Sequence, residues 1–115
     1  MTTITIRDRS RNQAIAEALL DNGAFKFEGN YYFKPDAVDM AHLNVTDRIY
    51  TCPYKGLANW IDLQTDDGVI KDVAWVYPAP KPGYEHIAGQ IGFYDGMRAG
   101  TEAVKSTESQ VLSEQ

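Results

Sequence analysis

The sequence predicts a mainly β protein built from antiparallel strands. Turn sequences separate short apolar and aromatic runs, as in a chain of β-hairpins, at residues 24–27, 31–33, 57–64, 69–77 and 87–94. All thirteen aromatic residues lie between Phe25 and Tyr94, and aromatic side chains bury the largest areas. A chain of 115 residues that is 43% hydrophobic suffices for one modest core. We therefore expect a single β domain over residues 1–95, with its core in residues 25–94.

Residues 12–20 are compatible with either a helix or a strand. Ile15, Leu19 and the neighbouring alanines fit one face of a helix, which Ser10 could cap. A half-buried strand is also compatible with a segment of this length. The local pattern leaves both alternatives open.

Tight-turn sequences define two hairpins. Glu28-Gly29-Asn30 separates the first two aromatic runs, and Asp66-Asp67-Gly68 separates the next two. Glycine after an acidic residue supplies the positive φ angles that a tight hairpin turn needs. The run at 87–94 contains Gly89 and Gly92. A glycine inside a strand often marks a bulge or a close approach of another group.

The second hairpin brings the two tryptophans together. If Asp67-Gly68 forms the loop, Trp60 lies directly opposite Trp75, and Leu63 lies opposite Asp72. A longer loop would shift this register. Directly opposite residues share a face of the sheet, so the tryptophans would form one aromatic face. Buried aromatic residues are common, and such a face is more often core than ligand platform.

The last part of the chain is poor in large apolar residues. From Asp95 onward Ser, Thr, Glu, Gln and Gly predominate, and no aromatic residue occurs. We expect a short helix over residues 97–105 and a flexible, disordered tail over residues 106–115. Residues 96–115 are therefore placed outside the β domain.

Charge and composition argue against several classes of partner. Eleven Lys and Arg residues against sixteen Asp and Glu residues give a net charge of −5, so neither nucleic acid nor an anionic membrane is expected as a partner. No apolar run approaches the ~20 residues needed to cross a bilayer. Charged residues stand where a signal peptide would be apolar, so we expect a cytoplasmic protein.

No metal or other cofactor is predicted. The single cysteine rules out an internal disulfide framework and a Cys-rich zinc site. A metal site would need three or four ligands within reach of one another. The spacing of Cys52, His42 and His86 gives no sign that these side chains converge.

The most unusual local sequence is Thr51-Cys52-Pro53-Tyr54-Lys55-Gly56, which contains the only cysteine. Pro53 favours an extended backbone at Cys52, and Gly56 permits a tight turn before the next strand. The ammonium of Lys55 would favour the thiolate, which is the nucleophilic form. The alternative is that Cys52 is a small buried filler, the commoner role of a free cysteine.

Asp72 stands beside the apolar and aromatic run 73–77. A carboxylate in such a strand must face solvent, a pocket or a partner. Lys55 is the expected partner, because the two motifs flank the same hairpin. Two interpretations stay open: an ion pair that holds the corner at residues 52–56 in place, or a pocket in which the pair acts as base or anion anchor.

Four motifs together resemble one known family. They are Cys-Pro-Tyr-Lys-Gly at 52–56 with Ala58 and Trp60, Asp-Val-Ala-Trp-Val-Tyr-Pro at 72–78, Ile-Ala-Gly at 87–89, and Phe-Tyr at 93–94. In this order and spacing they resemble the domain of unknown function 427 family, over roughly residues 13–95. The resemblance implies a compact, mainly antiparallel fold similar to the β-tent, and it favours a strand at residues 13–20.

The resemblance brings no established activity. The family has carried a nucleotidyltransferase-like label. This chain lacks the Gly-rich phosphate loops, and also the Gly-Ser followed by paired aspartates, that would support such a label.

Two hypotheses for function follow. In the first, the chain binds or transforms an unknown small molecule in a pocket near residues 52–56. Its candidate catalytic residues are Cys52, Lys55 and Asp72, and its candidate ligand-binding residues are Tyr54, Trp60, Trp75, Tyr77 and Tyr94. In the second, the motifs only specify the fold, and the sheet edges and the Pro-rich segment 77–84 bind another protein or a second copy in a homo-oligomer. The sequence does not decide between an enzyme and a non-catalytic domain.

Overall fold

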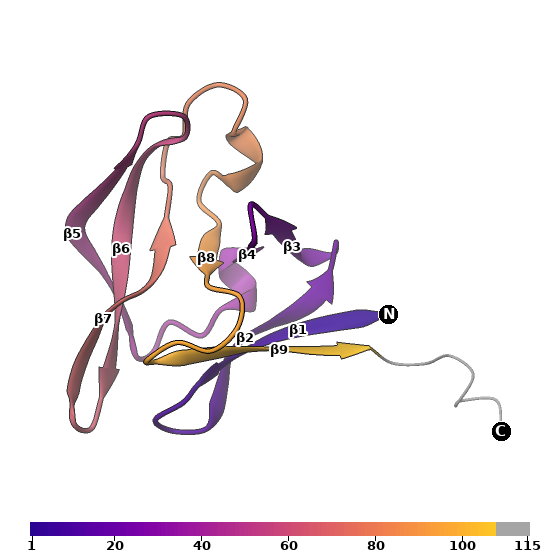
Figure 1. Ribbon diagram of the computed structural model, residues 1–115, viewed down its shortest axis with the longest axis vertical. Helices are drawn as coiled ribbons and strands as arrows, with labels where there is room; N and C mark the ends of the chain where they lie inside the picture. The colour runs from indigo at the N-terminus through magenta and orange to yellow at the C-terminus, as the bar shows by residue number, and fades with distance from the viewer. Residues whose placement is uncertain (108–115) are drawn as a thin grey trace, which may run out of the picture.

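The computed structural model describes residues 1–107, which form a mainly β structure (Figure 1). In chain order its strands are β1 (Thr2–Asp8), β2 (Gln13–Leu20), β3 (Gly23–Phe27), β4 (Asn30–Phe33), β5 (Leu43–Cys52), β6 (Gly56–Thr65), β7 (Gly68–Val76), β8 (Ile91–Phe93) and β9 (Thr101–Thr107). Two short 3₁₀ turns, η1 (Pro35–Ala37) and η2 (Glu85–Ile87), interrupt the strands. The predicted mainly β fold is confirmed.

All nine strands belong to one sheet, in the spatial order β5-β6-β7-β8-β4-β3-β2-β1-β9. Neighbouring strands are antiparallel, except that β2 and β3 run parallel over a short contact. The long strands β5, β6 and β7 form one wing, and β1, β2 and β9 form the other (Figure 1). The short strands β8, β4 and β3 connect the two wings.

Strand β6 buries opposite faces at its two ends. Toward its C-terminal end Ile61 and Leu63 point into the main core, together with residues such as Phe33 and Phe93. Toward its N-terminal end Ala58 points into a second cluster of buried residues, which consists of Tyr32, Cys52, Ala58, Trp75, Tyr77 and Ile87. The change of face follows from the alternation of side chains along a strand. This second cluster leads to the candidate site.

The main core extends beyond residues 25–94, where the aromatic distribution placed it. Ile4 and Ile6 of β1 are fully buried, and Ile15 of β2 is nearly so. Residues 13–20 form a strand, as the family resemblance indicated. The alternation of Ile4 and Ile6 with threonine is itself typical of a half-buried strand and could have revealed β1.

The segment after Asp95 joins the sheet, contrary to the sequence prediction. Strand β9 pairs with β1 from Thr2 opposite Thr107 to Asp8 opposite Thr101. The predicted helix over residues 97–105 is therefore wrong, and the β structure continues past residue 95. Because β9 is an edge strand with mostly exposed side chains, its sequence is polar and lacks the usual strand signal. The predicted tail begins inside β9, and its residues 108–115 lie outside the described part of the chain.

Both predicted hairpins form. The turn between β3 and β4 consists of Glu28 and Gly29, which have positive φ angles of 52° and 84°. The turn between β6 and β7 consists of Asp66 and Asp67, because Thr65 pairs with Gly68. This turn lies one residue earlier than the sequence predicted.

Trp60 lies opposite Trp75 as predicted, but two features combine to place it there. Near the turn Leu63 lies opposite Ile70, so the predicted pairing of Leu63 with Asp72 is wrong. Between this pair and the pair Ile61–Ala74, β6 has one residue and β7 has three. The resulting bulge includes Asp72, whose φ is 61°. Beyond the bulge, from the pair Ile61–Ala74 onward, the two strands pair in the predicted register.

Gly92 marks a close approach, as a glycine within a strand run indicated. It lies on β8, opposite Trp75 of β7 on one side and Tyr32 of β4 on the other. A Cβ atom at this position would lie within 2.9 Å of three atoms of the Trp75 indole. The indole therefore occupies the space that a side chain on β8 would fill.

Gly92→Ala should destabilise the protein by about 1–3 kcal/mol, because the added methyl group and the indole cannot share one space. Gly100→Ala is the matched control: Gly100 also lacks a positive φ, and its nearest neighbours are methyl groups at 3.0–3.4 Å that can shift slightly. Thermal denaturation should show a much larger loss of Tm for Gly92→Ala. Equal losses in the two variants would contradict the role assigned to Gly92.

Candidate functional site

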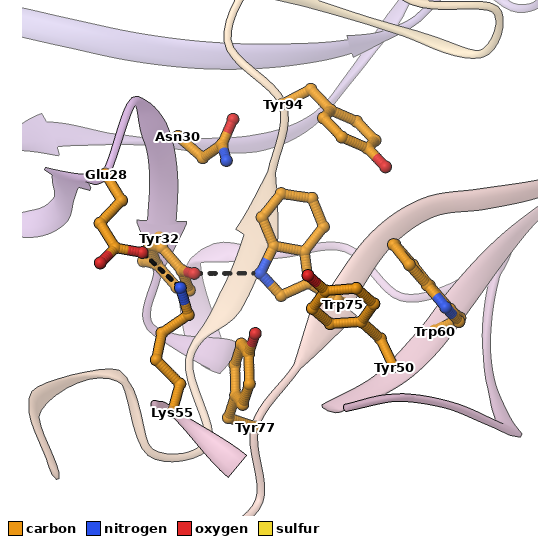
Figure 2. Close-up of a pocket in the computed structure, with 9 residues that line it drawn as sticks. All are labelled: Glu28, Asn30, Tyr32, Tyr50, Lys55, Trp60, Trp75, Tyr77 and Tyr94. Carbon is orange, nitrogen blue, oxygen red and sulfur yellow. Dashed lines mark hydrogen bonds and ion pairs between the residues drawn. The ribbon is translucent and has the colours of Figure 1, made fainter. Parts of the chain in front are cut away.

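A pocket of about 280 Å³ opens beside the second cluster (Figure 2). Its lining combines side chains from the wing of β5, β6 and β7 with side chains from the connecting strands and their turns: Glu28, Asn30, Tyr32, Tyr50, Lys55, Trp60, Trp75, Tyr77 and Tyr94. Six of these nine residues are tyrosine or tryptophan. The volume is close to the lower end of the ~300–1,000 Å³ that is typical of ligand pockets, so the pocket suits a small molecule.

A cross-strand row of the sheet supplies three of the rings. The register places Trp60 opposite Trp75, Trp75 opposite Gly92, and Gly92 opposite Tyr32. Because directly opposite residues share a face, these side chains all lie on the pocket side. The Trp75 Nε1–H crosses the position of Gly92 and donates a hydrogen bond to the Tyr32 hydroxyl at 3.1 Å. The row is thus tied together across a strand that has no side chain at this point.

The aromatic rings meet at large angles. The ring planes of Trp60 and Trp75 make an angle of 81°, with centroids 6.2 Å apart, and those of Trp75 and Tyr94 make an angle of 66° at 4.9 Å. Tyr50 and Trp60 make an angle of 63° at 5.8 Å. Such edge-to-face contacts are favoured by the ring quadrupoles. They also leave ring faces free to contact a ligand.

Lys55 and Glu28 form an ion pair at the polar end of the pocket (Figure 2). Lys55 is positioned by the turn between β5 and β6, and Glu28 by the turn between β3 and β4. Burial lowers the pKa of Lys55, but the hydrogen bond to the Glu28 carboxylate and the charge interactions with Glu28, Tyr77 and Cys52 together outweigh this effect and raise the pKa above its usual value. Lys55 is therefore an ammonium group at neutral pH.

Asp72 does not pair with Lys55, so this part of the sequence prediction is wrong. Its carboxylate accepts a hydrogen bond from Arg48 at 2.6 Å, and Arg48 also forms an ion pair with Asp62. The Asp72 backbone N–H donates to the Asp62 carboxylate at 3.0 Å. These contacts hold the bulge of β7, which sets the register of Trp75. Asp72 does not line the pocket. Its effect on the pocket is indirect, because the bulge at Asp72 determines where Trp75 lies on β7.

Asp62→Asn tests this network through the pH dependence of stability. Hydrogen bonds from Arg48 lower the pKa of Asp62, and burial opposes them only in part. A carboxyl group whose pKa falls on folding stabilises the protein above its unfolded pKa of about 3.9, and that contribution is lost as the pH falls through the folded value. Asp62→Asn should therefore cost about 1–3 kcal/mol at neutral pH. It should also make the loss of stability in acid shallower than in the wild type.

Urea denaturation at pH 7 and at pH 3 measures both effects. Asp66→Asn is the control: the Asp66 carboxylate is 98% exposed and its ion pair with Arg11 spans 3.9 Å, so this substitution should change both values little. An acid profile of Asp62→Asn that matches the wild type would contradict this assignment.

Cys52 packs in the second cluster and does not line the pocket. It is 7% exposed and lies among Tyr32, Trp75 and Tyr77. Burial raises the pKa of its thiol, but the backbone N–H groups of Lys55 and Tyr54 and the Lys55 ammonium lower the pKa below its usual value. A nucleophilic cysteine needs access as well as a lowered pKa. The environment of Cys52 therefore favours the buried filler.

Cys52 should react slowly with iodoacetamide in the folded protein, because the reaction must wait for local opening. We expect labelling at least about tenfold slower than in denaturant. Mass spectrometry follows the modification without ambiguity, since the chain has a single cysteine. Fast labelling of the folded protein, with an apparent pKa well below about 8.5, would instead identify an accessible thiolate.

Comparison with known proteins supports the family resemblance. A family model described as a domain of unknown function (DUF427) matches residues 12–108. The chain belongs to this family. Among curated proteins, none is significantly similar to the chain. The match to the DUF427 model includes every residue that lines the pocket, and it also includes strand β9.

Four of the five predicted ligand-binding residues lie in the pocket of this DUF427 domain. They are Trp60, Trp75, Tyr77 and Tyr94, and Lys55 joins them at the polar end. Tyr54 is 73% exposed and lies outside the pocket. The lining also contains residues that the sequence analysis did not select, namely Glu28, Asn30, Tyr32 and Tyr50. Position in an aromatic run could have suggested Tyr32, whereas nothing local marks Glu28.

Within residues 1–107, no group of three or more His, Cys, Asp or Glu side chains is placed to hold a metal ion. His86 packs its ring against Phe25 and Phe27, with centroids 5.7 Å and 4.6 Å away. In the same part of the chain, His86 and Cys52 share no hydrogen bond.

Among residues 1–107, no helix has the length and apolar character that crossing a membrane requires.

Proposed function

We propose that this DUF427 domain binds a small ring-bearing molecule in the pocket lined by Trp60 and Trp75. The observation that carries the proposal is the convergence of six aromatic side chains on one open pocket. Protein interiors are normally packed to the density of organic crystals, so rings gathered only for stability would be expected to close the space. Here Tyr50 remains 48% exposed at the rim.

The shape of the pocket supports a flat ligand. Trp60 and Trp75 are walls at a large angle, and a ring placed against one of them meets the edge of the other. Contacts of this kind contribute about 0.5–1.5 kcal/mol per ring pair beyond the burial of area. The Lys55–Glu28 pair adds a charged donor and a charged acceptor at one end. A small molecule with a ring and one polar group would match both parts.

The proposed function is binding without a covalent step at Cys52. The thiol is buried and lies outside the lining, so a ligand in the pocket would not reach it directly. Asp72 is likewise outside the lining and is engaged by Arg48. Lys55 is the remaining candidate catalytic residue in the pocket, and its proposed role is to bind the polar group of the ligand.

The alternative hypothesis, an interaction module, has less specific support. Val45, Ile49 and Leu57 on β5 and β6 are each about half exposed, and β5 is an edge strand. Such side chains fit many apolar partners. The pocket restricts the size, shape and polarity of its occupant, and binding of a small molecule is therefore the better supported function.

Trp60→Ala should weaken binding of a one-ring probe such as benzamide by about tenfold, which corresponds to the loss of one aromatic contact. Leu57→Ala is the matched control, because Leu57 lies on the same strand, points to the opposite face and is 52% exposed. Isothermal titration calorimetry gives both affinities. Equal binding by wild type and Trp60→Ala, or no binding by the wild type, would overturn the proposed function.

A further inference from the structure

We infer, on the basis of the proposed function, that the ligand carries an anionic group that takes the place of Glu28 on Lys55. The ligand class is then a small ring-bearing anion. Its ring would lie against Trp60 and Trp75, and its acidic group would lie at the polar end of the pocket. Three observations support this inference: the donors at that end, the position of Glu28, and the charge balance of the pocket.

Hydrogen-bond donors converge at the polar end. The Lys55 ammonium lies beside the hydroxyl groups of Tyr32 and Tyr77, as Figure 2 shows. The Tyr32 oxygen accepts the hydrogen bond from Trp75, which leaves its own proton to donate. Tyr77 is 3% exposed, and within residues 1–107 its hydroxyl has no hydrogen-bond partner. Because Tyr77 lines the pocket, its hydroxyl can donate to an acceptor on a ligand without giving up another hydrogen bond.

These hydroxyl groups keep their protons at neutral pH. Burial raises the pKa of Tyr77 to about 12, and it also raises the pKa of Tyr32. Together with the Lys55 ammonium they form a set of donors that suits a carboxylate or a phosphate. Charge-assisted hydrogen bonds of this kind are stronger than neutral ones.

In the structure, the Glu28 carboxylate is the anion paired with the Lys55 ammonium. It is a left-handed residue, with a φ of 52°, in the exposed turn between β3 and β4, where asparagine or glycine would be favoured. Its side chain is 49% exposed, whereas that of Lys55 is 15% exposed. The Glu28 carboxylate can therefore move into solvent while the ammonium stays in the pocket.

The backbone of Lys55 is held in place on both sides. Its carbonyl accepts a hydrogen bond from the Lys81 N–H at 2.8 Å, and its N–H donates to the Cys52 sulfur at 3.4 Å. Lys81 also donates from its ammonium to the Pro53 carbonyl at 2.9 Å. The Pro-rich connection thus fixes the corner that presents Lys55, and Glu28 is the more exposed partner of the pair.

The charge balance of the pocket favours an incoming anion. Glu28 is the one carboxylate and Lys55 the one ammonium among the lining residues, so the closed pair has no net charge. An anionic ligand exchanges one carboxylate for another and leaves the ammonium paired. A cationic ligand would have to displace the buried ammonium and leave it without a partner, which is the more costly exchange.

Three probes with one ring separate these cases: benzoate, benzamide and benzylammonium. The chain has two tryptophans and both line the pocket, so tryptophan emission reports binding. We expect benzoate to bind at least about tenfold more tightly than benzamide, the difference expected from one charge-assisted hydrogen bond. Benzylammonium should bind most weakly. The affinity of phenyl phosphate, compared with that of benzoate, shows whether the pocket binds a phosphate or a carboxylate more tightly.

Two variants of the ion pair make the test specific. Glu28→Gln removes the internal competitor, so benzoate should bind severalfold more tightly while benzamide is unchanged. Lys55→Met should abolish the preference for benzoate and leave benzamide binding in place. Glu102→Gln on β9 removes an acidic group outside the pocket, and it controls for the change in net charge.

The outcomes separate this inference from the proposed function. Weaker benzoate binding in Glu28→Gln, or equal binding of all three probes by the wild type, would overturn the inference while ring binding stands. Tightest binding of benzylammonium would do the same. No change in emission with any probe would overturn both.

Discussion

The Trp75 indole above Gly92 is the contact on which the second cluster and the pocket both depend. Strands β7, β8 and β4 lie side by side, and the middle strand has no side chain at this point. The indole fills that space and reaches the Tyr32 hydroxyl on the far strand. A larger residue at Gly92 would push the indole toward the pocket. One glycine in an apolar run thus sets the position of the pocket wall and ties one wing to the centre of the sheet.

The sequence predicted those parts of the site that follow from short-range rules. Turn chemistry located the hairpin at Glu28 and Gly29, and strand patterning placed Trp60 and Trp75 on one face. The same rules marked Gly92 as a close approach. The tryptophan pairing nevertheless has a cause that patterning did not reveal. The turn lies one residue earlier than predicted, which shifts the pairing of β6 with β7 near the turn. The bulge at Asp72 shifts the pairing back, so that Trp60 lies opposite Trp75.

The sequence could not predict which charged groups meet. Lys55 pairs with Glu28, which lies far away in the chain on a hairpin that β8 brings into place. Asp72 pairs instead with Arg48, because the bulge directs its carboxylate toward β5. Strand β9 escaped prediction for a related reason: a polar edge strand is specified by its partner β1 and not by its own apolar pattern. In each case the deciding contact depends on long-range pairing of strands.

The central claim is that this aromatic pocket is a ligand site, and nuclear magnetic resonance of the ¹⁵N-labelled chain tests it most directly. The chain has two indole N–H signals, one each from Trp60 and Trp75. On titration with benzamide, both signals should shift together and saturate, and the amide signals of β1 and β9 should stay in place. Indole signals that do not move, or shifts concentrated in β1 and β9, would contradict the account.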